Sequence, residues 1–229
     1  MRCRGCLNEC DSGSTDIVIH EPCSDVAGFR TEEIATSDLE LQERIVRHCS
    51  PTLAGLKCGS MFKIASASHG LTHSLRRIQS AVKSKGVRMM FLSTDDSGCL
   101  VYVYRQDLLA KRLADHHVQS FLHEYGYSSS GVNKALAELR RRFVLCPMPP
   151  EVGVFLDYPM EDIIGYIENS GRCSRCIGCW KVYGDAEAAE RKFNMFRKCR
   201  DVYCRRLSEG YPISVLAVNT RIKSEPVVQ

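Results

Sequence analysis

The sequence lacks any long hydrophobic run, and this absence sets its first limits. No segment approaches the roughly 18 consecutive apolar residues that a membrane-spanning helix needs. The first residues, Met-Arg-Cys-Arg-Gly-Cys, lead into no apolar core of a secretory signal. We therefore expect a protein that stays in the cytoplasm and does not enter a membrane.

A strong excess of one charge is also missing. The chain has 31 basic and 27 acidic residues, which gives a formal net charge of +4. Such a balance predicts a mixed surface, and the basic stretches carry no interleaved aromatic residues or nucleic-acid motif. Neither nucleic acid nor lipid is therefore an expected partner.

Cysteine, in contrast, is abundant. The 13 cysteines are an odd number, in a chain of 229 residues that is too long for a disulfide-stapled miniprotein. Because the cytoplasm keeps thiols reduced, we expect metal ligands, catalytic groups or core residues rather than disulfides.

Composition divides the chain into three parts. Residues 1–36 are rich in Cys, Ser, Asp and Gly, and they predict a flexible, cysteine-rich extension. Residues 37–219 predict one globular domain, since 44% apolar content can supply one sizeable core. Residues 220–229 predict a disordered tail.

Apolar periodicity and turn residues predict the elements of this domain. A helix from Ser37 should break near Ser50-Pro51, where a short second helix starts. A turn at residues 95–98 should join two apolar strands into a buried hairpin. The further predicted elements are helices at residues 52–57, 71–85, 106–125, 131–143, from Pro159 and from Asp185, and strands at 87–93, 99–105 and 152–156. The fold class is α/β or α+β, with a small helix-flanked sheet.

The sharpest chemical signal is a run of three cysteines, Cys173, Cys176 and Cys179, at equal spacings of three. This spacing lets a tight loop direct several sulfur atoms at one centre, as in iron-sulfur proteins, and paired Cys-x-x-Cys segments serve zinc equally well. Tyr183 stands where the ferredoxin run has its fourth cysteine, so Cys199 or Cys204 would supply the fourth ligand. The alternative is a thiol-rich surface loop.

A second cysteine cluster lies near the N-terminus. It consists of Cys3, Cys6 and Cys10, with Cys23 further along the chain. These thiols would complete the first site, form a site of their own, or have no function in an unstructured extension.

A different chemistry is indicated around Cys49. It directly precedes the predicted helix start at Ser50-Pro51, and a helix N-terminus lowers the pKa of a thiol and favours the nucleophilic thiolate. A thiol enzyme of this kind would act on a small molecule bound near Lys57 and Arg105. The alternative is a cysteine that packs between helices.

Several segments resemble one known family. They are residues 48–57, 104–105, 151–159 with Glu161-Asp162, and 180–184. Together they are similar to the uncharacterised bacterial family known as domain of unknown function 3793, over about residues 38–208. The resemblance does not reach the N-terminal cysteines.

The resemblance implies little about activity, because no activity is established for the family, which occurs largely in anaerobic bacteria. Its genes are associated with those for flavodoxins and ferrous-iron uptake, which implies a role in iron or electron handling and a flavodoxin as partner. Pro150 stands where a histidine is common, and Asp157 replaces the usual glycine. The missing histidine weakens an enzymatic interpretation.

The sequence thus predicts a cytoplasmic accessory protein that binds a metal through cysteines or acts in redox chemistry, with an iron-sulfur cluster or zinc as cofactor. Two alternatives remain open. One is a thiol-dependent enzyme that uses Cys49, and the other is a metal-free protein-interaction module.

Overall fold

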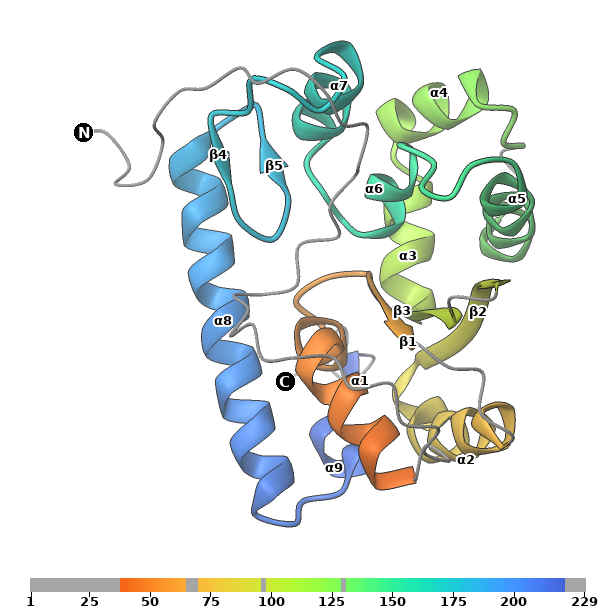
Figure 1. Cartoon of the computed structure of the whole chain (residues 1–229), viewed down its shortest axis with the longest axis vertical. Helices are drawn as coiled ribbons and strands as arrows, with labels where there is room; N and C mark the ends of the chain where they lie inside the picture. Colours follow the sequence, from red (N-terminus) through yellow and green to blue (C-terminus); the bar gives the residue numbers. More distant parts are fainter. Residues whose placement is uncertain (1–37, 65–69, 96–97, 129–130, 221–229) are drawn as a thin grey trace, which may run out of the picture.

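The computed structural model describes residues 38–64, 70–95, 98–128 and 131–220. Figure 1 shows a small central sheet covered by helices, with the long helix α8 along one side. The helices are α1 (Asp38–Leu53), α2 (Leu71–Val82), α3 (Gln106–Leu113), α4 (His116–Glu124), α5 (Val132–Leu145), α6 (Val152–Phe155), α7 (Met160–Glu168), α8 (Ala186–Ser208) and α9 (Ile213–Leu216). A short 3-10 turn, Lys83–Lys85, follows α2.

The main sheet is antiparallel and has the strand order β1-β3-β2, from β1 (Gly59–Ile64), β2 (Val87–Asp95) and β3 (Gly98–Arg105). Residues of the central strand β3 alternate between the two faces: Val101 and Val103 join a core with α1, α2 and α9, whereas Leu100 and Tyr102 join a core with α3 to α6. Because both faces are covered, β3 reads as a continuous apolar run in the sequence.

A second, two-stranded sheet forms a small hairpin of β4 (Cys176–Ile177) and β5 (Lys181–Val182). This hairpin lies beside α7 and the first turns of α8 (Figure 1). With α8 it encloses a third apolar cluster, which contains Trp180, Phe193 and Phe196. The predicted fold class, a mixed α and β domain with a helix-flanked sheet and a buried hairpin, is confirmed.

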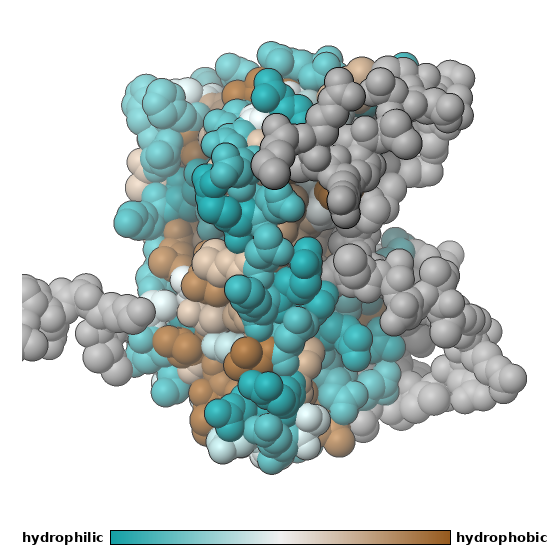
Figure 2. Space-filling model, turned by 90° about the vertical axis from the view of Figure 1, so that its left-hand side faces the viewer, coloured by the Kyte–Doolittle hydropathy of each residue, from teal (hydrophilic) through white to brown (hydrophobic). Residues whose placement is uncertain are grey.

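Several predicted elements are confirmed in detail. The buried hairpin is β2 and β3, and α7 begins directly after Pro159. Helix α8 begins after Asp185, whose side chain accepts a hydrogen bond from Ala188 N at 3.0 Å. The face of the molecule on the α8 side is mainly hydrophilic and has smaller apolar areas (Figure 2).

Four predictions were wrong. Helix α1 does not break at Ser50-Pro51 but continues to Leu53, since residues 49–53 are all buried and packing compensates for the amide that proline lacks. The second helix predicted at residues 52–57 is therefore not a separate element. Helix α1 ends at Leu53, and strand β1 begins at Gly59. Residues 152–156 were predicted as a strand, but residues 152–155 form helix α6, which Glu151 separates from Pro149 and Pro150. The long helix at residues 106–125 is two helices, because Asp115 caps α4 by accepting bonds from His117 N and Val118 N.

The described residues include no helix that is both long and apolar enough to cross a lipid bilayer. The predicted extension at residues 1–36 lies outside the described residues, as does the predicted tail apart from Thr220.

The side chain of Arg105 connects three segments of the domain: the end of α1, the turn before β2 and the segment after α9. Its side chain is fully buried at the end of β3, and its guanidinium donates to the carbonyl oxygens of Thr52 at 2.5 Å and of Leu53. Both carbonyl groups lie in the last turn of α1, where Thr52 O also accepts from Gly55 N at 3.1 Å and Leu53 O from Val218 N at 3.0 Å. Further bonds reach Lys85 O at 3.0 Å and Val218 O at 2.7 Å. One side chain thus fixes α1, the start of β2 and the segment after α9.

We predict that Arg105→Ala lowers the free energy of unfolding by at least about 3 kcal/mol, because it removes a fully buried guanidinium and its hydrogen bonds to four backbone carbonyl groups. Urea unfolding followed by circular dichroism measures this. Arg88→Ala is the matched control: Arg88 also donates to two backbone carbonyls, Lys83 O and Val87 O, but at a partly exposed position. The control should lose less than about 1 kcal/mol. Equal losses would contradict the central role of Arg105.

Candidate functional site

Segments that lie far apart in the sequence meet around the side chain of Lys57. Its Nζ atom lies 5.5 Å from the ring centroid of Tyr158. Tyr158 in turn stacks on Trp180, with 4.9 Å between ring centroids. Trp180 Nε1 donates to the carboxylate of Asp162 at 2.7 Å. Residues from three of the segments that carry the family resemblance therefore form one contiguous site.

Lys57 is the unusual charge in this site. It lies in the turn between α1 and β1 and is only 9% exposed, and its Nζ atom also lies 5.6 Å from the ring centroid of Phe196. Within the described part of the chain, Nζ makes no hydrogen bond and no ion pair. Burial lowers the pKa of Lys57 below its ordinary value, and the strongest opposing charge is that of Cys179.

The cysteine hairpin is attached to the body of the protein by Asp162 on α7. This carboxylate is buried and accepts three hydrogen bonds, from Trp180 Nε1 at 2.7 Å, Tyr183 N at 2.7 Å and Gly184 N at 2.8 Å. Lys181 Nζ also donates to Gly171 O at 2.8 Å, which closes the loop at its base. Charge-assisted bonds to a buried carboxylate are stronger than neutral ones, so the hairpin is firmly placed.

Two glycines permit the close approach of the hairpin to its neighbours. A Cβ atom on Gly178 would lie 2.2 Å from the Phe193 ring of α8. On the other side, a Cβ atom on Gly165 of α7 would lie 2.4 Å from Cβ of Tyr183. Because carbon atoms do not approach this closely, only glycine allows both contacts.

The three predicted ligands of the run differ in their surroundings. Cys176 and Cys179 are partly buried and pack against the aromatic cluster of the hairpin and α8. Cys173 is exposed and has a φ of 55°. Burial raises the pKa of the Cys179 thiol, whereas the cations of Lys57, Arg197 and Arg200 act in the opposite direction. Among the described cysteines, none is joined to another by a disulfide.

Cys199 and Cys204, the expected sources of a fourth ligand, lie on α8. Burial, followed by the charge of Cys204, raises the pKa of Cys199 to about 11. Cys204 packs against the core between the sheet and α1 rather than the hairpin cluster. Within residues 38–64, 70–95, 98–128 and 131–220, no group of three or more Cys, His, Asp or Glu side chains is placed to hold a metal ion. The N-terminal cysteines Cys3, Cys6, Cys10 and Cys23 lie outside these ranges.

Cys49 is not at a helix N-terminus, so the expected cause of a low pKa is wrong. It lies within α1, is fully buried and belongs to the main core. Burial raises its pKa well above the ordinary value, and the charge of Lys57 offsets only part of this rise. Arg105, the other predicted binding residue, has its guanidinium engaged by backbone carbonyls as described above.

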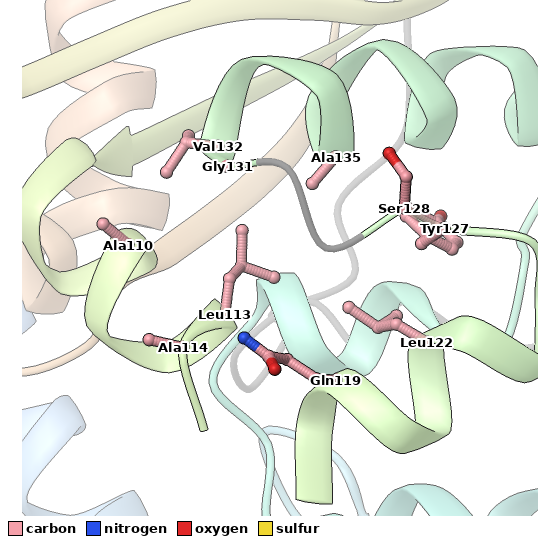
Figure 3. Close-up of a pocket in the computed structure, with 10 residues that line it drawn as sticks. All are labelled: Ala110, Leu113, Ala114, Gln119, Leu122, Tyr127, Ser128, Gly131, Val132 and Ala135. Atoms are coloured by element: carbon pink, nitrogen blue, oxygen red, sulfur yellow. The ribbon is translucent and has the colours of Figure 1, made fainter. Parts of the chain in front are cut away.

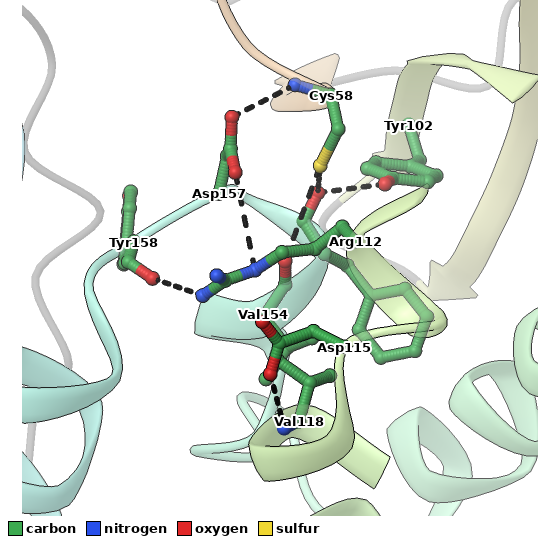
Figure 4. A network of polar contacts seen from close by, with 9 residues as sticks. Cys58, Tyr102, Arg112, Asp115, Val118, Val154, Asp157 and Tyr158 are labelled. Atoms are coloured by element: carbon green, nitrogen blue, oxygen red, sulfur yellow. Dashed lines mark hydrogen bonds and ion pairs between the residues drawn. The ribbon is translucent and has the colours of Figure 1, made fainter. Parts of the chain in front are cut away.

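A polar network joins Cys58, just before β1, to the turn after α6 (Figure 4). Asp157 Oδ2 accepts from Cys58 N at 3.2 Å, and Oδ1 lies 3.9 Å from Arg112 Nε. The hydroxyl of Tyr102 donates to Phe155 O at 2.7 Å. Asp157 has a φ of 61°, a conformation that glycine adopts without strain, which explains why glycine is the expected residue there.

A cavity elsewhere in the molecule contains none of the predicted site residues. It has a volume of about 150 Å³ and lies between α3, α4 and α5 (Figure 3). Its lining is largely apolar, and Gln119, Tyr127 and Ser128 are its polar members. This cavity is therefore separate from Lys57 and the hairpin.

Sequence reasoning missed the aromatic residues that surround Lys57. Neither Tyr158 nor Phe196 was among the predicted site residues. The usable signal was that Lys57, Tyr158 and Trp180 all belong to the segments of the family resemblance.

A comparison of the whole sequence with known families confirms the family resemblance of these segments. Residues 45–217 match the family described as protein of unknown function (DUF3793). The chain belongs to this family. In this DUF3793 protein the matched region includes Lys57, Asp162 and the cysteine hairpin. No curated protein and no solved structure matches the chain.

We predict that Asp162→Asn detaches the hairpin, because an amide nitrogen would face an N–H group that now has a carboxylate acceptor. The emission of Trp180, the only tryptophan, should shift to longer wavelength, and amide exchange at residues 176–184 should accelerate. Glu161→Gln, at the exposed neighbouring position, is the control and should change neither. Unchanged emission in Asp162→Asn would contradict the attachment.

We also predict that Cys49 reacts with iodoacetamide only when the protein unfolds. Burial and the raised pKa both suppress the thiolate in the folded state. Mass spectrometry of peptides from chains labelled with and without urea measures this, and the exposed Cys173 is the internal reference. Labelling of folded Cys49 at the rate of Cys173 would restore it as a candidate nucleophile.

Proposed function

We propose that this chain is a thiol-based redox accessory protein in which Cys176 and Cys179 cycle between dithiol and disulfide. The carrying observation is that both side chains come from one hairpin and pack against one aromatic cluster. Two cysteines separated by two residues have the spacing of dithiol redox motifs. The reaction belongs to a reducing compartment such as the cytoplasm, where such a pair is repeatedly reduced.

The charges around Cys179 support its role as the attacking thiol. Burial raises the pKa of Cys179, but the charges of Lys57, Arg197 and Arg200 act in the opposite direction and favour its thiolate form. The thiolate attacks one sulfur of a substrate disulfide, which forms a mixed disulfide and releases the first thiol. Cys176 then attacks the Cys179 sulfur and releases the second thiol, so that two protein thiols become one disulfide and the substrate disulfide becomes two thiols. A redox protein such as a flavodoxin, the partner implied by the family resemblance, would return the electrons.

A metal centre on the same loop is the second candidate. The equal spacing of Cys173, Cys176 and Cys179 and the neighbouring cations favour it, because cations offset the charge of thiolate ligands. The described residues do not complete a ligand set, so the missing sulfur atoms would come from the N-terminal cysteines. Iron-sulfur clusters and zinc both accept such ligands.

The redox proposal predicts that mild oxidation of the folded protein with oxidised glutathione forms one disulfide, between Cys176 and Cys179. Trapping the remaining thiols with a maleimide of known mass counts them, and peptide mapping locates the bond. Cys176→Ser and Cys179→Ser should each abolish this disulfide, whereas the control Cys146→Ser should retain it. Absence of the bond in the wild-type protein would contradict the proposal.

Elemental analysis after oxygen-free purification separates the two candidates. Iron or zinc in stoichiometric amount, lost on combined replacement of the three loop cysteines by serine, would favour the metal centre. A metal-free protein that forms the disulfide would favour the redox dithiol. A metal-free protein that forms no disulfide would return the chain to the third interpretation, a protein-interaction module.

A further inference from the structure

The charge of the chain is unevenly distributed along the sequence. Residues 1–37 contain three basic and seven acidic residues, whereas residues 38–229 contain 28 basic and 20 acidic residues. Residues 9–25, which we call the acidic segment, carry five carboxylates and neither lysine nor arginine. The small net charge of the whole chain therefore conceals two parts of opposite charge, which attract each other.

Helix α8 carries much of the positive charge of the domain. It contains seven basic and three acidic residues, and its buried residues are only Ala189, Phe193 and Phe196. Residues three or four positions apart share one face of a helix. On α8 they form an exposed row in which cations alternate with apolar side chains. The members of this row, which we call the α8 stripe, are Arg191, Met195, Lys198, Val202 and Arg205.

The α8 stripe is accessible to a partner. Met195 and Val202 are 40% and 44% exposed, and the α8 side of the molecule shows apolar areas between hydrophilic ones (Figure 2). Lys198 forms no ion pair with the described residues. The two arginines of the stripe pair with Glu187 and Glu209, but these ion pairs are exposed and contribute little. The stripe therefore favours a partner that is both acidic and apolar.

The acidic segment has this chemistry. Its apolar residues Ile17-Val18-Ile19 lie between the carboxylates of Asp16 and Glu21. Apolar side chains with acidic neighbours thus complement Met195 and Val202, whose neighbours on the stripe are cations.

The chain also enters the domain beside α8. Helix α1, which begins at Asp38, packs along α8 in the opposite direction (Figure 1). Lys57, after the end of α1, approaches Phe196, whereas the charge of Arg47 acts on Cys204, nearer the end of α8. The 12 residues between the acidic segment and α1 span about 40 Å when extended, and α8 is about 35 Å long. The acidic segment can therefore reach every part of the stripe, and its attachment keeps its local concentration high.

We propose that the acidic segment docks on the α8 stripe of its own chain. Its apolar residues pack against the two apolar members of the stripe, and its carboxylates pair with the neighbouring cations. The docked segment brings Cys10 and Cys23 to the side of the domain that carries the cysteine hairpin, which lies beside the first turns of α8 (Figure 1). This inference does not depend on the proposed redox function.

Zero-length cross-linking of the full-length protein under reducing conditions tests the docking. A carbodiimide joins a carboxylate to a lysine amine where the two are in contact, and peptide mass spectrometry maps the bonds. Bonds from the acidic segment should be at least about fivefold more frequent at Lys198 than at other exposed lysines. The reference lysines are Lys83, Lys111 and Lys134, before β2 and on α3 and α5. The preference should disappear in about 1 M NaCl, because salt screens exposed charges.

A double variant separates the stripe from general attraction to a basic surface. Met195→Glu with Val202→Glu replaces its apolar members by like charges and keeps Lys198, where the yield should fall on the order of fivefold. The matched control is Val144→Glu with Leu145→Glu, which adds the same charges at exposed apolar positions near the end of α5. It should leave the yield at Lys198 unchanged, and circular dichroism checks the fold of both proteins.

A change within the acidic segment tests the same contact without altering α8. Val18→Asp should lower the yield at Lys198 as the stripe variant does. Equal yields at Lys198 and the three reference lysines, or an unchanged yield in both the stripe variant and Val18→Asp, would overturn the docking.

A mixture of unlabelled and nitrogen-15-labelled chains identifies the occupant of the stripe. Bonds within one chain are expected. Bonds between differently labelled chains would assign the stripe to a second copy and overturn docking within the chain. Because the cross-link uses no thiol, the result is independent of the disulfide between Cys176 and Cys179, so either proposal can fail without the other.

Discussion

Attachment of the cysteine hairpin to α7 by the Asp162 carboxylate is the interaction on which the candidate site depends. Its three hydrogen bonds to Trp180, Tyr183 and Gly184 fix both the indole ring and the backbone of the hairpin. The placed indole supports Tyr158, and Tyr158 forms one wall of the space occupied by the Lys57 amine. Without this anchor, a hairpin with strands of two residues each would have little stability of its own.

A second buried charged residue, Arg105, fixes the part of the site that carries Lys57. Arg105 closes the C-terminus of α1, and the turn that carries Lys57 begins directly after that helix end. Two buried charged groups, Asp162 and Arg105, thus hold the hairpin and the end of α1 in place, and both form several hydrogen bonds. Lys57 differs from both, because it is buried with aromatic rings in place of hydrogen-bond partners.

Elements with strong local signals were predictable from the sequence. The turn between β2 and β3, the Asp185 cap of α8 and the proline before α7 each act within a few residues, so local chemistry decides the structure. The continuation of α1 through Pro51 depends on packing of residues 49–53, which no local pattern reveals. Residues 152–156 were misassigned because a short buried apolar run fits a strand and a helix equally well.

The candidate site was predictable only in its parts. The spacing of Cys176 and Cys179 identified the hairpin thiols, and Lys57 was named as a binding residue. Their proximity could not be predicted, because it requires the turn after α1, the turn before α7 and the hairpin to meet in three dimensions. The low pKa expected for Cys49 was inferred from a helix start at Ser50-Pro51, and tertiary packing continues α1 through that position.

Nitrogen-15 NMR of the Lys57 amino group, compared between the wild-type protein and Cys179→Ser, tests the central claim most directly. Because the charge of Cys179 opposes the effect of burial on Lys57, the account predicts that the pKa of Lys57 falls further in the variant. An identical titration of Lys57 in both proteins would contradict the claim that the anchored hairpin places Cys179 within electrostatic reach of Lys57.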